Sequence, residues 1–153
     1  MSIRQPPQHL DFLEHLCGKN PSSKNEAPFS NYYDALTYAA IVGFKNEKRE
    51  PLAKGKGKDP ITYLTMSNNS SFGALLAVFA VLENKEDHTC LSGENAELRI
   101  KVFEEYACGG LTLLKDAQVG YGGSLRDYVE AEVVQELTSI LSEFESEEEE
   151  SNS

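Results

Sequence analysis

The chain has 153 residues, and hydrophobic residues make up 40% of it, enough for a single buried core. Its 25 acidic and 14 basic side chains give a formal net charge of -11, which favours solubility and disfavours unspecific binding to polyanions or anionic membranes. Residues 1–7 lack the apolar run of a secretion signal, so we do not expect export. The three cysteines are odd in number and widely spaced, which suits a reducing compartment better than a disulfide framework. We therefore expect a cytoplasmic protein.

The N-terminal third predicts two helices separated by polar loops. Residues 1–7 are expected to be a flexible N-terminus, and residues 8–16 carry leucines at helical spacing. Asn31 is suited to cap a second helix that ends near Gly43, because its side chain can accept a hydrogen bond from the first turn. Residues 45–58 show no regular periodicity and predict a loop.

The middle of the chain predicts one extended segment and two helices. Residues 61–66 alternate apolar and polar side chains, which suits a short strand, although the sequence offers no visible partner strand. An apolar third helix is expected through residue 82; its apolar run is too short to span a bilayer. A fourth helix should begin near Glu94 and be interrupted at Gly109-Gly110, where the paired glycines indicate close approach of another backbone.

The C-terminal part predicts a flexible turn at residues 120–123 and a last helix capped by Ser124, with an apolar stripe extending to Phe144. We expect the stripe to pack on the core of the domain, with an intermolecular seam as the alternative. Residues 145–153 are glutamate-rich and predict a disordered acidic tail. The expected fold is all-α: a single compact bundle of about five helices over residues 8–144.

No group of residues predicts catalysis. The chain has no Gly-x-Ser-x-Gly elbow, no P-loop and no dinucleotide-binding fingerprint. Cys108 has acidic near neighbours, which do not activate a thiol, so a buried packing role is expected for it. We therefore predict no catalytic residue and no cofactor, and keep a small enzyme as an alternative.

Two His-x-Cys pairs are the only candidates for metal binding that the sequence spacing suggests. Imidazole and thiolate are ligands that zinc accepts, but structural zinc sites usually have wider ligand spacings. A metalloprotein is therefore an alternative rather than the main prediction, and it would use four residues: His15, Cys17, His88 and Cys90.

A basic segment stands out against the acidic chain. It contains six positive side chains within residues 45–58: Lys45, Lys48, Arg49, Lys54, Lys56 and Lys58. Such a segment can contact phosphates with strong salt dependence, remain solvated, or dock on an acidic protein surface, including the tail of another copy. The negative field of the remaining chain favours the last two interpretations.

Two segments resemble a known family. Ala39-Ala40-Ile41-Val42-Gly43, followed by Lys48-Arg49-Glu50-Pro51-Leu52, resembles the "Ala-Ala-x-x-Gly, basic-basic-x-Pro-Leu" signature of bacterial Dnd-system-associated accessory proteins, in particular the small family numbered four. Phe103-Glu104-Glu105-Tyr106-Ala107, leading into Gly109-Gly110, is similar to that family's second signature. Order and separation also fit, so the likeness extends over residues 8–116. The glutamate-rich end and Cys108 depart from the pattern.

The resemblance implies association with phosphorothioation of bacterial DNA, in which sulfur replaces a non-bridging phosphate oxygen, and with restriction of unmodified invading DNA as antiviral defence. It implies a non-catalytic adaptor. Lys48 and Arg49 are then candidates for phosphate or partner contact, and Glu104, Glu105 and Tyr106 for recognition along a helix. The expected partners are proteins of a modification or restriction system, with weak DNA contact through residues 45–58 and a homodimer left open. The alternative is a small DNA-binding transcriptional regulator.

Overall fold

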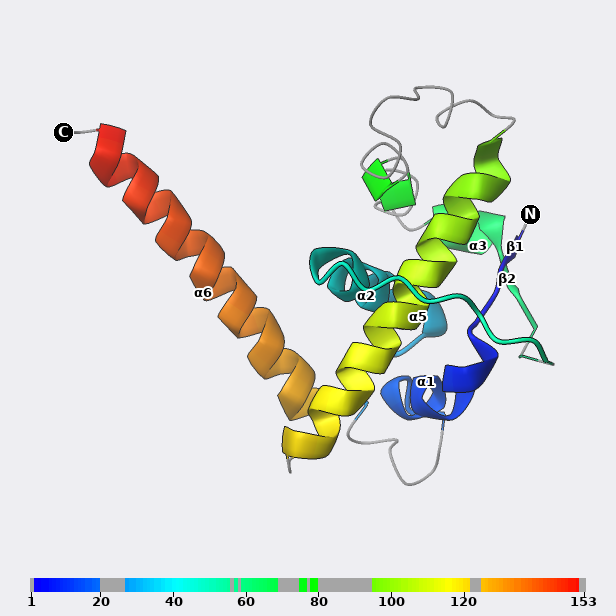
Figure 1. Cartoon of the computed structure of the whole chain (residues 1–153). Helices are drawn as coiled ribbons and strands as arrows, with labels where there is room; N and C mark the ends of the chain where they lie inside the picture. The colour runs from blue at the N-terminus through cyan, green and yellow to red at the C-terminus, as the bar shows by residue number, and fades with distance from the viewer. Residues whose placement is uncertain are drawn as a thin grey trace.

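The computed structural model describes residues 2–19, 27–55, 57, 59–68, 75–76, 78–79, 95–121 and 125–151. Its elements in chain order are β1 (Ser2–Ile3), the 3-10 helix η1 (Pro7–His9), α1 (Leu10–Leu16), α2 (Tyr32–Lys45), β2 (Ile61–Thr62), α3 (Tyr63–Ser67), α5 (Ala96–Tyr121) and α6 (Leu125–Ser151). Figure 1 shows α1 and α2 against the long central helix α5, with α6 directed away from them. The all-α prediction is confirmed. None of the described helices is long and apolar enough to cross a membrane.

The first helical segment forms where leucine spacing predicted it. Phe12, Leu13 and Leu16 on α1 are buried and face the core. Gly18 follows the helix with φ of 66°, a left-handed conformation that glycine adopts without steric cost. The conformation of Gly18 therefore explains why α1 ends after Leu16, as predicted.

The start of α2 confirms the predicted Asn31 cap. The Asn31 side chain accepts a hydrogen bond of 2.9 Å from the backbone N–H of Asp34, which satisfies one of the unpaired amides of the first turn. The helix continues to Lys45, slightly beyond the expected end at Gly43. It ends before Glu47, whose φ of 54° leaves the helical region.

The central helix α5 corrects the predicted interruption at Gly109-Gly110, because it runs unbroken through both glycines. The expected close approach of another backbone is confirmed: a Cβ on Gly110 would overlap the carbonyl of Ala39 in α2. Glycine in a helix costs about 1 kcal/mol relative to alanine. Direct backbone packing between α2 and α5 offsets that cost, so the glycine pair locates a contact and does not break the helix.

The N-terminus corrects the expectation that residues 1–7 are flexible. β1 pairs antiparallel with β2, with Ile3 opposite Ile61, and the Ile3 side chain is fully buried. Only two residues of the predicted extended segment 61–66 are strand. Thr62 then accepts a hydrogen bond from the N–H of Thr65 and caps α3. The partner strand lies far away in sequence, so no local pattern could reveal the pairing.

The predicted third helix lies largely outside the described residues. Within the described part, residues 75–76 and 78–79 are helical, and Leu76 and Phe79 are each 2% exposed. Both belong to the hydrophobic core. The predicted turn at 120–123 and the Ser124 cap also fall mostly outside the described ranges, and α5 extends to Tyr121.

The last helix, α6, extends further than the sequence predicted. It begins by packing Tyr128 and Val129, which are 8% and 6% exposed, and its later turns project away from the other helices (Figure 1). It also remains helical to Ser151, where the sequence predicted a disordered tail from residue 145. Glutamate is a good helix former, which favours continuation of α6 through these residues.

Candidate functional site: a strap across α5 and a projecting acidic helix

The two segments that carried the family resemblance meet in space. Residues 46–55, which we call the strap, cross α5 after α2 ends (Figure 1). The backbone N–H of Glu50 donates a 3.1 Å hydrogen bond to the carbonyl of Glu105. A Cβ on Gly109 would overlap the carbonyl of Lys48, so the strap needs this glycine to lie flat on the helix. Both segments are therefore parts of one packing contact.

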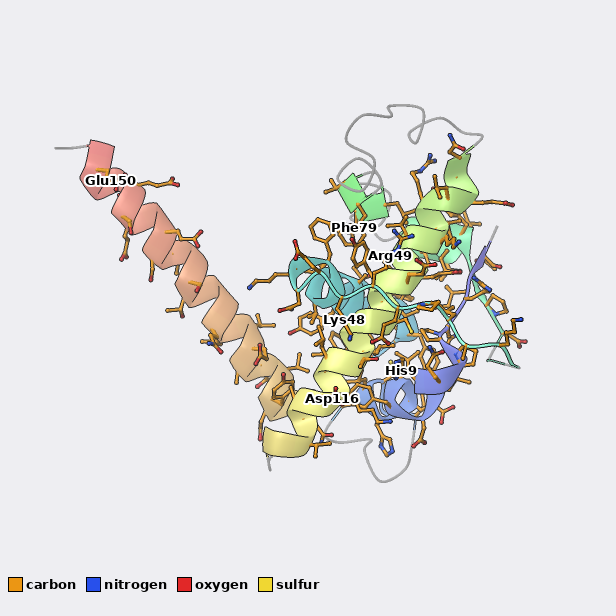
Figure 2. The ribbon with its side chains drawn as sticks, viewed as in Figure 1. His9, Lys48, Arg49, Phe79, Asp116 and Glu150 are labelled. Atoms are coloured by element: carbon orange, nitrogen blue, oxygen red, sulfur yellow. The ribbon has the colours of Figure 1, made fainter. Side chains whose placement is uncertain are left out.

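The two basic residues singled out in the strap pair with glutamates of the same chain. Lys48 Nζ lies 3.3 Å from Glu50 Oε1, and Arg49 Nε pairs with Glu105 Oε2. The Arg49 guanidinium also lies 6.0 Å from the centroid of the Tyr106 ring, within cation–π range. Lys48 and Arg49 lie over α5 in Figure 2. Their side chains remain 45% and 34% exposed, so they hold the strap while still reaching solvent.

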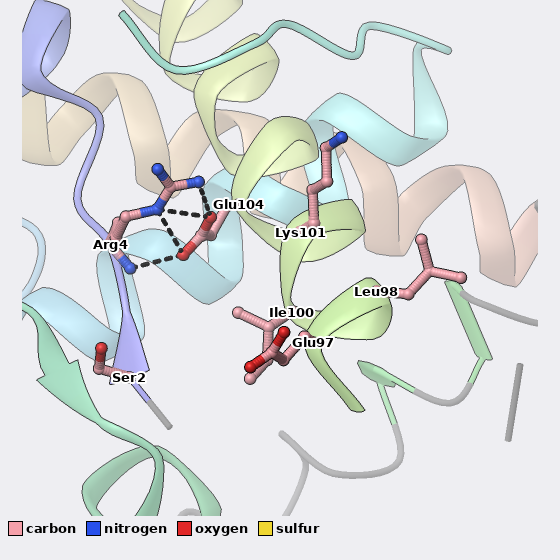
Figure 3. A pocket seen from close by; sticks show the side chains of 7 residues that line it. All are labelled: Ser2, Arg4, Glu97, Leu98, Ile100, Lys101 and Glu104. Atoms are coloured by element: carbon pink, nitrogen blue, oxygen red, sulfur yellow. Dashed lines mark hydrogen bonds and ion pairs between the residues drawn. The ribbon is translucent and has the colours of Figure 1, made fainter. Parts of the chain in front are cut away.

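Glu104 anchors the N-terminal segment. Its carboxylate is 3% exposed and accepts hydrogen bonds from the Arg4 guanidinium at 2.9 Å and from the Arg4 backbone N–H at 2.7 Å (Figure 3). The hydrogen bond to Glu104 raises the pKa of Arg4 above its usual value. A hollow of about 580 Å³ opens beside the pair and is lined also by Ser2, Glu97 and Lys101. The pair fixes β1 to α5.

Tyr106 belongs to an aromatic cluster. It is 5% exposed, and its ring centroid lies 5.4 Å from those of both Phe44 and Phe79. Phe44 and Phe79 stack on each other at 4.7 Å. Such ring pairs stabilise a core beyond the area they bury. The Tyr106 ring therefore packs α5 against α2.

The other basic candidates occupy different surroundings. Lys45 at the end of α2 and Lys54 in the strap are exposed. Lys56 and Lys58 lie outside the described residues. Phosphate contact by this segment stays a prediction.

The His-x-Cys pairs are described only in part. Cys17 is 4% exposed, and its thiol donates to the carbonyl of Asn31 at 3.3 Å. His15 is partly exposed on α1. His88 and Cys90 lie outside the described residues, so the four-residue metal site stays a prediction.

A buried polar cluster beneath the strap was not predicted from the sequence. His9 from η1 and Cys108 from α5 are 8% and 0% exposed, and Glu50 of the strap lies beside them. The Thr112 hydroxyl connects the group, at 2.9 Å from His9 Nε2 and 2.8 Å from Glu50 Oε2. Burial lowers the pKa of His9, and burial with nearby Glu50 and Glu105 raises the pKa of Cys108 to about 12. Three distant segments form the cluster, so no local spacing could indicate it.

Gln8 locks this cluster to the strap. Its side-chain amide donates to Cys108 Sγ and to the Pro51 carbonyl, each at 3.1 Å. Its carbonyl oxygen accepts from the Ala53 N–H at 2.9 Å. The Gln8 side chain thus binds the strap at two residues, Pro51 and Ala53, and orients the Cys108 thiol.

An apolar groove lies between α2 and α6. It has a volume of about 700 Å³, and its walls include Ile41, Val42 and Phe44 from α2 and Val133 from α6. Ile41 and Val133 are 45% and 39% exposed. Beyond the groove, α6 continues to its acidic end, where Glu150 lies far from the strap (Figure 2). Glu132 and Glu143 of α6 also line the groove, so its apolar floor lies beside an acidic wall.

The comparisons with known proteins identify the family. No curated protein and no solved structure matches the chain. The family model described as DNA sulphur modification system-associated protein 4 matches residues 2–152, nearly the whole chain. The match agrees with the resemblance seen in the strap and along α5. The chain belongs to the family of DNA sulphur modification system-associated protein 4.

Proposed function

We propose that this accessory protein of a DNA sulphur modification system is a non-catalytic adaptor, and that it binds a protein of the modification machinery or its linked restriction machinery through α6. The observation that carries the proposal is the projecting helix with exposed apolar side chains. Val134 and Leu141 are each 61% exposed on it. Apolar side chains gathered on a projecting helix mark an interaction surface.

The groove beside α6 supports a particular mode of binding. Its apolar lining comes from two diverging helices, α2 and α6. An amphipathic helix binds such a groove by laying its apolar face on the floor and keeping its polar face in water. We assign the groove to one amphipathic helix of a partner protein.

The charge of α6 defines the partner's chemistry. Residues 125–151 contain ten acidic side chains and a single basic one, Arg126. An apolar helix flanked by lysine and arginine would match this acidic wall and be steered toward it. Proteins that handle DNA carry basic surfaces of this kind, which fits a partner within a DNA modification or antiviral restriction system.

Direct DNA binding, as by a transcriptional regulator, has less support. Lys48 and Arg49 pair with Glu50 and Glu105, and the chain as a whole is strongly negative. DNA contact would then rely on other exposed lysines of the basic segment, such as Lys54. Salt-sensitive duplex binding that falls after Lys54→Ala would favour the regulator over the adaptor.

Direct binding assays test the adaptor proposal. The full chain would be titrated against each purified protein of the sulphur modification and restriction system. We expect one of them to bind, and Ile41→Ser combined with Val133→Ser to weaken binding more than about tenfold. Val119→Ser is the matched control, because Val119 is 79% exposed and does not line the groove.

Two results would overturn the proposal. One is the absence of binding to every component of the system. The other is equal weakening by the groove variants and by the control, which would remove the groove from the interface. Sedimentation of the isolated chain tests a further outcome. A wild-type dimer that is lost in the groove variants would show that the groove binds a second copy of this chain, and not a helix of another protein.

A further inference from the structure

The buried cluster beneath the strap brings together three side chains that commonly bind zinc. An imidazole nitrogen of His9, a carboxylate oxygen of Glu50 and Cys108 Sγ all lie within 4.8 Å of one another. They come from η1, the strap and α5, so the tertiary structure alone assembles them. We propose that His9, Glu50 and Cys108 bind one Zn²⁺ ion.

The donor set fits zinc in kind and in number. Zinc is bound by thiolate, imidazole and carboxylate groups, and a site with three protein ligands leaves its fourth position for water. Bond lengths of about 2.0 to 2.3 Å place neighbouring zinc ligands about 3.3 to 3.8 Å apart. The present separations of up to 4.8 Å therefore require the three side chains to move inward by about 1 Å.

The hydrogen bonds around His9 leave one imidazole nitrogen without a partner. The Thr112 hydroxyl has a single proton, which it donates to Glu50 Oε2, so it accepts from His9 Nε2–H. The Nδ1 lone pair is then buried without a hydrogen-bond partner in the described part of the chain. An unsatisfied buried acceptor is costly, and a cation bound at Nδ1 would relieve that cost while Nε2–H kept its hydrogen bond to Thr112.

The surroundings resemble the outer shell of a metal site. Thr112 connects His9 to Glu50, and Gln8 donates to Cys108 Sγ, so each ligand is oriented by a hydrogen bond. Glu50 and Glu105 also create a negative potential at the thiol. That potential opposes a free thiolate but favours a divalent cation, which binds in exchange for the thiol proton.

A metal here would connect the parts that define the fold. It would tie η1 to the strap and to α5, beside the glycines on which the strap rests. This inference is independent of the adaptor proposal, because the cluster and the α6 groove have no lining residue in common.

Metal binding to the full chain tests the inference. The protein would be freed of metal with a chelator and then titrated with Zn²⁺ and, separately, with Co²⁺. We expect one zinc per chain by native mass spectrometry and a thiolate-to-cobalt charge-transfer band in the near ultraviolet. Cys108→Ser should abolish the band, and His9→Gln and Glu50→Gln should each weaken zinc binding more than about tenfold.

Cys17→Ser and Cys90→Ser are the matched controls, since they alter the other two cysteines, and both should keep the band. Circular dichroism would establish that each variant is folded. If Cys108→Ser does not fold, the zinc stoichiometry of the wild type still tests the inference. Absence of stoichiometric zinc from the folded wild type would overturn the inference. So would a cobalt band that disappears with Cys17 or Cys90, or zinc affinity that His9→Gln and Glu50→Gln leave unchanged.

Discussion

Gly110 on α5 lies directly against the backbone carbonyl of Ala39 on α2, with no space for a side chain between them. Gly43 on α2 makes the reciprocal contact, since a Cβ there would overlap the carbonyl of Tyr106. The two helices thus touch backbone to backbone. This contact sets the position of the strap and of the α2 wall of the groove.

Gly110→Ala should destabilise the protein by about 2 kcal/mol, because the added methyl group must push α2 away from α5. The higher helix propensity of alanine offsets only part of that cost. Gly57→Ala is the comparison: its Cβ would lie 3.3 Å from the Gln5 carbonyl oxygen, which need shift only slightly, so the change should cost less than Gly110→Ala. Urea unfolding measures both changes. Equal stability of Gly110→Ala and wild type would contradict the close helix contact.

Arg4→Ala should lower the free energy of unfolding by about 2 kcal/mol, because it removes hydrogen bonds from the buried Glu104 carboxylate. Arg126→Ala provides the comparison. Its ion pair with Glu130 is exposed on both sides, at 53% and 68%, and such pairs contribute well under about 1 kcal/mol. The two variants would be compared by chemical denaturation. Similar small losses would show that the N-terminal segment does not depend on Glu104.

Tyr128 at the junction of α5 and α6 should make stability depend on alkaline pH. Burial, and then the nearby Glu132, raise the pKa of its phenol above the usual value of 10. The stabilisation from the protonated phenol is complete below pH 10 and is lost as pH rises through the higher folded pKa. Between pH 9 and pH 11 wild type should therefore lose more stability than Tyr128→Phe. Urea unfolding measures the stability of both proteins. Equal losses of stability in wild type and Tyr128→Phe would show that burial does not raise the pKa of Tyr128.

Ending the chain after Ser142 should leave the stability of the remaining protein nearly unchanged. The removed segment carries six glutamates and no basic residue, so the formal charge changes from -11 to -5. Glu145, Glu147 and Glu148 are exposed, and the like charges of this end repel one another. The melting temperature should shift by only a few degrees, about the effect of 1 kcal/mol or less. A large fall in melting temperature would instead show that this end supports the core.

The same truncation should weaken binding of a basic partner helix and remove much of the salt dependence of that binding.

The sequence by itself determined the class of fold and some of the starts and ends of its local elements. Leucine spacing predicted α1, Asn31 predicted the start of α2, and Gly109-Gly110 predicted a close backbone contact. These signals act within a turn or two of a helix, where hydrogen-bond geometry and side-chain period depend on neighbouring residues. The family resemblance also followed from short segments of sequence.

Only the tertiary structure decided which residues meet. It paired β1 with β2, placed Arg49 on Glu105, and gathered His9, Glu50 and Cys108 beneath the strap. It also showed α6 projecting, where the apolar stripe favoured packing on the core and an intermolecular seam was the alternative. Such contacts join segments far apart along the chain, and their energy depends on how whole elements pack, so no local pattern encodes them.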